Sequence, residues 1–144
     1  MTKAEVKKLV PKGELVFIVL VLFSYAGMAL HNYVELPGMS PLNPQYLLPI
    51  AIYVILTVAW LRPNNRRRWT WLTFLWGVIQ LFVGAGLSVL PLSIWPFYPE
   101  QSTRHYLVHA AYGIAQIPLL SYTGALLMRP QWARGGDIQR NQTR

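Results

Sequence analysis

The fold of this chain is decided by an unbroken apolar stretch near its start, residues 14–33, which read ELVFIVLVLFSYAGMALHNY. At about 1.5 Å per residue, a helix of this length covers about 30 Å, the thickness of the hydrocarbon layer of a membrane. The helical pattern continues through Gly27-Met28-Ala29, where a signal peptidase would have to cut. We therefore predict a membrane-spanning helix at this position rather than a cleaved signal peptide.

Three further apolar segments follow, and short proline-rich, aromatic or arginine-rich loops separate them. The predicted spans are residues 14–33, 46–61, 69–92 and 104–128. Short loops make helices that are consecutive in sequence neighbours in space. The sequence thus predicts an all-α fold, an integral membrane four-helix up-down bundle. It forms one domain, 14–128, between a basic N-terminal segment, 1–13, and a polar basic tail, 129–144.

The charge distribution predicts the orientation of these spans. Only 12% of the residues are charged, against about 25% in a typical soluble domain. Yet the net charge is +8, and the Lys and Arg residues gather in 1–13, 62–68 and 129–144, whereas the other loops hold only Arg104. Because basic loops stay inside, we expect both termini in the cytoplasm and a multi-pass protein of a plasma or inner membrane. Topology explains the basic character, so we expect no nucleic-acid partner.

Several kinds of chemistry are excluded by the residues that are missing. The chain has no cysteine, which rules out disulfides, thiolate metal sites and cysteine catalysis. Its single aspartate, Asp137, lies in the predicted cytoplasmic tail, and no Ser-His-Asp arrangement can be recognised. We expect a non-enzymatic protein or an accessory subunit, with the lipid bilayer and a protein subunit as candidate partners.

A group of ionisable residues is predicted at the outer end of the bundle. Residues 102–118, STRHYLVHAAYGIAQIP, carry His105 and His109 one helical turn apart, on the same face. His31 and Glu35 have the same spacing at the end of the first span. The first and last helices are antiparallel neighbours in a closed bundle. We therefore expect His31 to be level with His109, and Glu35 level with His105.

Four roles are open for this group. It can close the outer end of the bundle as a polar network. His31, Glu35, His105 and His109 can bind zinc, copper or non-haem iron. His31 and His109 can be the axial ligands of a b-type haem in a membrane redox subunit. The group can also be a proton relay or a pH-sensitive contact. A histidine followed by small residues on one membrane helix resembles small membrane b-type cytochromes.

Two amides are predicted close to the membrane midplane. Gln80 is about 16 Å along its helix from Trp69, and Gln116 is about 18 Å from Arg104 on the next helix. An unpaired amide in hydrocarbon is costly, so we expect a hydrogen bond between Gln80 and Gln116. The alternative is a substrate- or quinone-contacting site in a small transporter or lipid-binding protein.

The 62–68 loop has two interpretations as well. Arg66, Arg67 and Arg68 precede Trp69 at the expected inner surface. They are a topology signal, or they bind the headgroups of anionic lipids.

Overall fold

The computed structural model describes residues 12–38, 40, 42–94 and 99–129, and their regular structure is entirely helical. The predicted segments 1–13 and 129–144 lie outside the described residues, apart from positions 12, 13 and 129. The helices are α2 (Lys12–Glu35), α3 (Pro44–Leu61), α4 (Arg66–Ile79) and α5 (Thr103–Leu127). After α4 the chain continues as a π-helix, η1 (Gln80–Gly86), and a 3₁₀ turn, η2 (Leu87–Val89).

Three helical segments in the described part of the chain are long and apolar enough to cross a membrane. They are Gly13–Glu35, Pro44–Leu61 and Arg66–Val89, and they overlap the first three predicted spans with bounds shifted by up to three residues. Helix α5 is not among them, although a membrane span was predicted there. It carries two histidines, a glutamine and several hydroxyl residues that lower its hydropathy.

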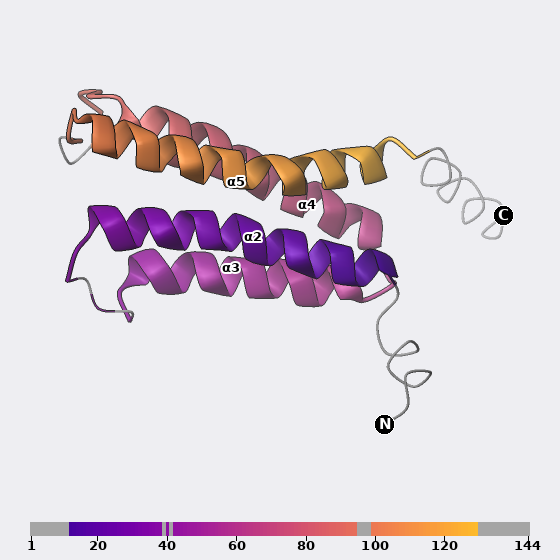
Figure 1. Cartoon of the computed structure of the whole chain (residues 1–144). Coiled ribbons are helices and arrows are strands. Elements are labelled where there is room, and N and C mark those ends of the chain that lie inside the picture. Colours follow the sequence, from indigo (N-terminus) through magenta and orange to yellow (C-terminus); the bar gives the residue numbers. More distant parts are fainter. Residues whose placement is uncertain (1–11, 39, 41, 95–98, 130–144) are drawn as a thin grey trace, which may run out of the picture.

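Each helix packs against two others. Helix α2 contacts α3 and α5, and α4 contacts α3 and α5, so that the contacts close into a ring. Figure 1 shows consecutive helices running in opposite directions. The start of α2, the link between α3 and α4, and the end of α5 lie at one end of the molecule (Figure 1). Helix α5 shares its most extensive contact surface with α2, the helix at the other end of the sequence.

Local signals in the sequence set several helix ends. The Asn43 side chain accepts a hydrogen bond from the Gln45 amide at 2.9 Å, and Pro44 takes the first helical position of α3. The Ser102 side chain caps α5 in the same way, accepting from the His105 amide at 3.2 Å. This cap fixes where the turn that carries His105 begins.

The third predicted span differs from the structure. Its helix begins at Arg66, three residues before the predicted start at 69, and it ends at Val89 rather than at 92. The wider π-helical turn and the tighter 3₁₀ turn take up its last part. The first span also continues beyond the predicted residue 33 to Glu35, which puts Glu35 on the same helix as His31.

Small residues allow the helix backbones to approach one another closely. A Cβ atom on Gly77 would lie 2.9 Å from Leu120 Cδ2, and one on Gly84 would lie 2.6 Å from the Tyr112 hydroxyl. A Cβ atom on Gly27 would overlap the Cβ atom of Ala115. Helices α2 and α3 also pack through aromatic rings, because the ring of Phe17 stacks on Trp60 with centroids 3.9 Å apart. Close packing of this kind stabilises helix pairs in membranes.

Candidate functional site

The first and last helices meet through a direct contact between two histidines. His31 on α2 and His109 on α5 place their Nε2 atoms 2.8 Å apart, within hydrogen-bond distance. The ring centroids are 4.3 Å apart, and the rings are nearly perpendicular. The two residues are therefore level, as the sequence predicts from their depths along antiparallel helices.

The second nitrogen of each ring faces an oxygen. His31 Nδ1 is 3.0 Å from the side-chain oxygen of Asn32, and His109 Nδ1 is 3.1 Å from the carbonyl oxygen of Ala85. The amide nitrogen of Asn32 donates to Met28 Sδ at 3.2 Å and to the Gln45 carbonyl at 3.1 Å. These two bonds fix the orientation of the Asn32 amide, so its oxygen is the atom that faces His31.

A second pair lies next to the first. His105 Nδ1 is 2.6 Å from Glu35 Oε2, which confirms the predicted level of these two residues. Their side chains expose only 8% and 9% of their surface. The rings of His105 and His109 have centroids 4.4 Å apart, so the two pairs are contiguous. We call His31, Glu35, His105 and His109 the histidine cluster.

Two buried atoms of the histidine cluster have no hydrogen-bond partner among the described residues. They are His105 Nε2 and Glu35 Oε1. The neighbouring Arg104 does not supply one, because it pairs with Glu100 at 3.5 Å and both side chains are largely exposed. Unpaired polar atoms are costly in a buried site, so these two need an explanation.

The π-helix supplies a contact that the sequence did not predict. Ala85 lies in η1, and its carbonyl oxygen accepts the hydrogen bond from His109. Segments of π-helix change the regular backbone pairing and are frequent at functional sites. The run Gly84-Ala85-Gly86 is the only visible signal, because such small residues let another helix approach the backbone.

At the expected midplane, Gln116 has a different set of partners from the one predicted. It shares no hydrogen bond with Gln80, so that prediction was wrong. Its amide nitrogen donates to the Ser24 carbonyl at 3.1 Å and to the Tyr112 carbonyl at 3.3 Å. Its oxygen accepts from the hydroxyls of Ser24 and Tyr53. Gln80 Nε2 is buried without a hydrogen-bond partner among the described residues.

The reason is the position of α2 and α3. Ser24 on α2 and Tyr53 on α3 reach the side chain of Gln116 and also bond to each other at 2.7 Å. Gln116 is completely buried in this polar group. The depth of each glutamine along its helix places the two at one level. Depth alone does not show which side chains α2 and α3 contribute at that level.

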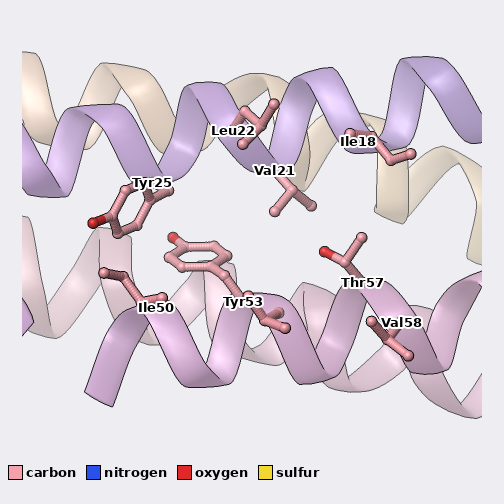
Figure 2. A pocket seen from close by; sticks show the side chains of 9 residues that line it. Ile18, Val21, Leu22, Tyr25, Ile50, Tyr53, Thr57 and Val58 are labelled. Carbon is pink, nitrogen blue, oxygen red and sulfur yellow. The ribbon is translucent and has the colours of Figure 1, made fainter. Parts of the chain in front are cut away.

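An apolar pocket of about 390 Å³ lies between α2 and α3. Figure 2 shows Tyr25 from α2 and Tyr53 from α3 extending into the space between the two helices. Tyr53 connects this pocket with the polar group around Gln116, because its hydroxyl bonds to Ser24. The other lining residues are Ile18, Val21, Leu22, Ile50, Val54, Thr57 and Val58.

The three arginines of the basic loop have different surroundings. Arg66 is held inside the structure: it donates to Glu14 at 2.6 Å and to the Trp60 carbonyl at 3.1 Å. Its guanidinium also lies over the Trp60 ring, 4.6 Å from the centroid. Arg67 and Arg68 are exposed. Of the three arginines predicted to bind lipid headgroups, only Arg67 and Arg68 are thus exposed enough to reach a lipid surface.

The geometry bears on the metal and haem alternatives. Among the described residues, no group of three or more His, Asp or Glu side chains is arranged to hold a metal ion. Two nitrogens on opposite sides of one metal are separated by about 4 Å, because each bond is about 2 Å long. The Nε2 atoms of His31 and His109 are at 2.8 Å and face each other. In this arrangement they bind one another.

No protein-family model matches this chain, and no characterised protein or solved structure is significantly similar to it. The function is therefore inferred from the chemistry of the described residues.

Proposed function

We propose that this chain is a non-enzymatic, multi-pass membrane protein or accessory subunit in which the histidine cluster joins the outer ends of α2 and α5. In this proposal all four helices cross the membrane as an up-down bundle, with both termini in the cytoplasm. The membrane is the plasma membrane or an inner membrane. Three helices with the length and hydropathy of membrane spans support the proposal.

The distribution of side chains on α5 supports a fourth span. Its polar residues His105, His109, Gln116 and Thr123 are buried against the other helices. Its most exposed large side chains include Leu107, Ile114 and Ile117, which are 50–65% exposed and apolar. A helix with a polar face turned inward and an apolar face turned outward suits a bilayer even when its mean hydropathy is modest.

The position of the basic residues supports the orientation. The ends of α2 and α5 that adjoin segments 1–13 and 129–144 lie beside the arginine loop between α3 and α4 (Figure 1). The described ends of the chain that lead into the two terminal basic segments are therefore at the same end of the molecule as the arginine loop. The histidine cluster lies toward the other end, where Arg104 is the only basic residue other than histidine.

The observation that carries the proposed role is the direct contact of His31 with His109, 2.8 Å across the α2–α5 interface. The bond from His105 to Glu35 crosses the same interface at 2.6 Å. Each bond joins residues that are 70 or more positions apart in the sequence. Bonds between such distant segments fix the first helix against the last.

A double-mutant cycle tests this role. We expect His31→Leu and His109→Leu each to destabilise the protein, because each leaves the opposite imidazole, buried in His109 and half-buried in His31, without its partner. The double variant should cost less than the sum, with a coupling energy of about 0.5–2 kcal/mol. The measurement is thermal unfolding of the purified protein in detergent or lipid. Tyr33→Leu, at an exposed position of the same helix, is the control. Additive losses in the cycle would contradict the proposed role.

The other functions stay as predictions with different tests. A metal- or b-haem-binding redox subunit requires a stoichiometric metal or a haem absorption band in the purified protein. Lipid binding or transport has its structural candidate in the apolar pocket between α2 and α3, next to Tyr53. Binding of anionic lipid headgroups has its candidates in Arg67 and Arg68.

A further inference from the structure

The hydrogen bonds around His31 and His109 determine where their protons lie. A neutral imidazole has one N–H donor and one nitrogen acceptor. His109 Nδ1 faces the Ala85 carbonyl oxygen, which can only accept. His31 Nδ1 faces the Asn32 side-chain oxygen, whose orientation is fixed by the two bonds that the Asn32 nitrogen donates. Both Nδ1 atoms must therefore carry a proton.

With both Nδ1 atoms protonated, the two Nε2 atoms that face each other cannot both be satisfied in neutral rings. If both rings were neutral, the two Nε2 atoms would present lone pairs to each other at 2.8 Å, which is repulsive. One further proton between them turns the repulsion into a hydrogen bond. We infer that His31 and His109 form a proton-binding site that holds one proton between their Nε2 atoms, so that the pair carries one positive charge.

The surroundings of the pair contain effects of both signs. Burial is the largest effect and opposes a positive charge on either ring, as does the neighbouring His105, whereas the smaller effects of Asn32, Glu35 and the Ala85 carbonyl favour it. Glu35 bonds to His105 Nδ1, so a neutral His105 donates to the carboxylate from this nitrogen. The histidine cluster then holds one positive and one negative charge. This balance lowers the cost of placing either charge in a buried site.

The other groups near the pair do not replace the proton. Tyr112 on α5 lies against His31 with its ring 5.4 Å away, and it is a neutral group. Arg104 and Glu100 pair with each other in an exposed position. From α3, the nearest contribution is the Gln45 carbonyl, which is occupied by Asn32. Geometry decides between the opposing effects, because only an added proton makes the His31–Asn32, His109–Ala85 and His31–His109 contacts attractive at the same time.

Two atoms beside the pair have unused hydrogen-bonding capacity within the described part of the chain. His105 Nε2 is buried without a partner, and its ring lies 4.4 Å from that of His109. The other ring nitrogen bonds to Glu35, whose Oε1 is also without a partner among the described residues. An imidazole can accept a proton at one nitrogen and release one at the other. Among the described residues, His105 and Glu35 therefore border the pair with one unpaired atom each.

The test is nitrogen NMR of the histidine side chains in the full chain, reconstituted in lipid nanodiscs at pH 8. An ordinary histidine, with a pKa of about 6.5, is almost fully neutral there. We expect three ring protons on the two imidazoles of His31 and His109, and one on His105. Finding one proton on each of the three rings would overturn the proposal. The signals are assigned with His31→Gln, His109→Gln and His105→Gln. Tyr33→Leu, at an exposed position outside the histidine cluster, should leave the shared proton in place.

A second measurement follows the loss of the proton. Because the folded protein binds a proton that the unfolded chain lacks at this pH, its stability should fall as the pH is raised until the pair becomes neutral. Thermal unfolding in the same nanodiscs reports this change, and it should be absent in His31→Gln. A pair that becomes neutral with no loss of stability would overturn the site's role in joining α2 to α5.

This inference deepens the proposed function and rests on the α2–α5 contact that it describes. The two can nevertheless fail separately. If His31 and His109 are coupled in the double-mutant cycle but carry only two ring protons between them, the α2–α5 contact keeps its proposed role and the proton-binding site is ruled out. No coupling in the double-mutant cycle would remove the proposed role itself.

Discussion

Gln116 and Gln80 show that the contribution of a buried amide to stability depends on the hydrogen-bond partners around it. Gln116 is completely buried, and both ends of its amide have partners from α2, α3 and its own helix. Gln80 is also buried, but its amide nitrogen has no hydrogen-bond partner among the described residues. The same side chain at nearly the same depth therefore has two different energetic roles.

We expect Gln116→Leu to destabilise the folded protein by about 1–2 kcal/mol, because Ser24 and Tyr53 lose a buried partner. Gln80→Leu should cost less, since the Gln80 amide nitrogen has no hydrogen-bond partner among the described residues and the amide only borders the hydroxyls of Tyr53 and Tyr112. Unfolding of both variants in the same detergent gives the comparison. A larger loss for Gln80→Leu than for Gln116→Leu would show that the polar group around Gln116 is not a stabilising unit.

The residue scale also shows which predictions the sequence can support. The depth of a side chain follows from the rise per residue, so counting residues correctly placed His31 level with His109 and Glu35 level with His105. Rotation about the helix axis follows from packing, which counting does not contain. The predicted hydrogen bond between Gln80 and Gln116 was wrong because packing directs the Gln116 side chain to Ser24 and Tyr53 instead. The proton arrangement in the histidine cluster needed Asn32 and Ala85, whose positions only the structure gives.

At the scale of the elements, α5 has the most extensive contacts of the helices. It contacts α2, α4 and η1, and its close approach to α2 depends on Gly27 facing Ala115. Helix periods, caps and apolar lengths can be seen in the sequence, and they predicted four helices close to those observed. A π-helix has no comparable signature, because its wider turn depends on packing rather than on residue type. The η1 segment and its contact with His109 were therefore not predicted.

Gly27→Ala tests the packing of α2 on α5. The added Cβ atom would overlap Ala115, and overpacking of this kind costs about 1–3 kcal/mol. Gly86→Ala is the matched control, because its Cβ atom would meet only the Leu81 carbonyl oxygen at an ordinary 3.5 Å. We expect a lower unfolding temperature for the first variant and little change for the second. Equal unfolding temperatures for the two variants would contradict the close approach of α2 and α5.

At the scale of the whole molecule, two kinds of residue separate along the helices. Among the described residues, the arginine loop between α3 and α4 lies at one end, and the histidine cluster lies toward the other. Hydropathy alone identifies three of the proposed spans, whereas the fourth depends on the inward-facing polar residues of α5. The orientation and the fourth span both follow from the proposal that α5 crosses the membrane.

The most direct test of this account is the accessibility of single cysteines, which the cysteine-free chain makes simple. Four exposed positions at the helix ends are suitable: Ser40, Asn64, Thr103 and Met128. In intact cells, a thiol reagent that cannot cross the membrane should label Ser40→Cys and Thr103→Cys. It should label Asn64→Cys and Met128→Cys only after the membrane is opened. Labelling of Thr103→Cys and Met128→Cys from the same side would contradict the account, because α5 would then not cross the membrane.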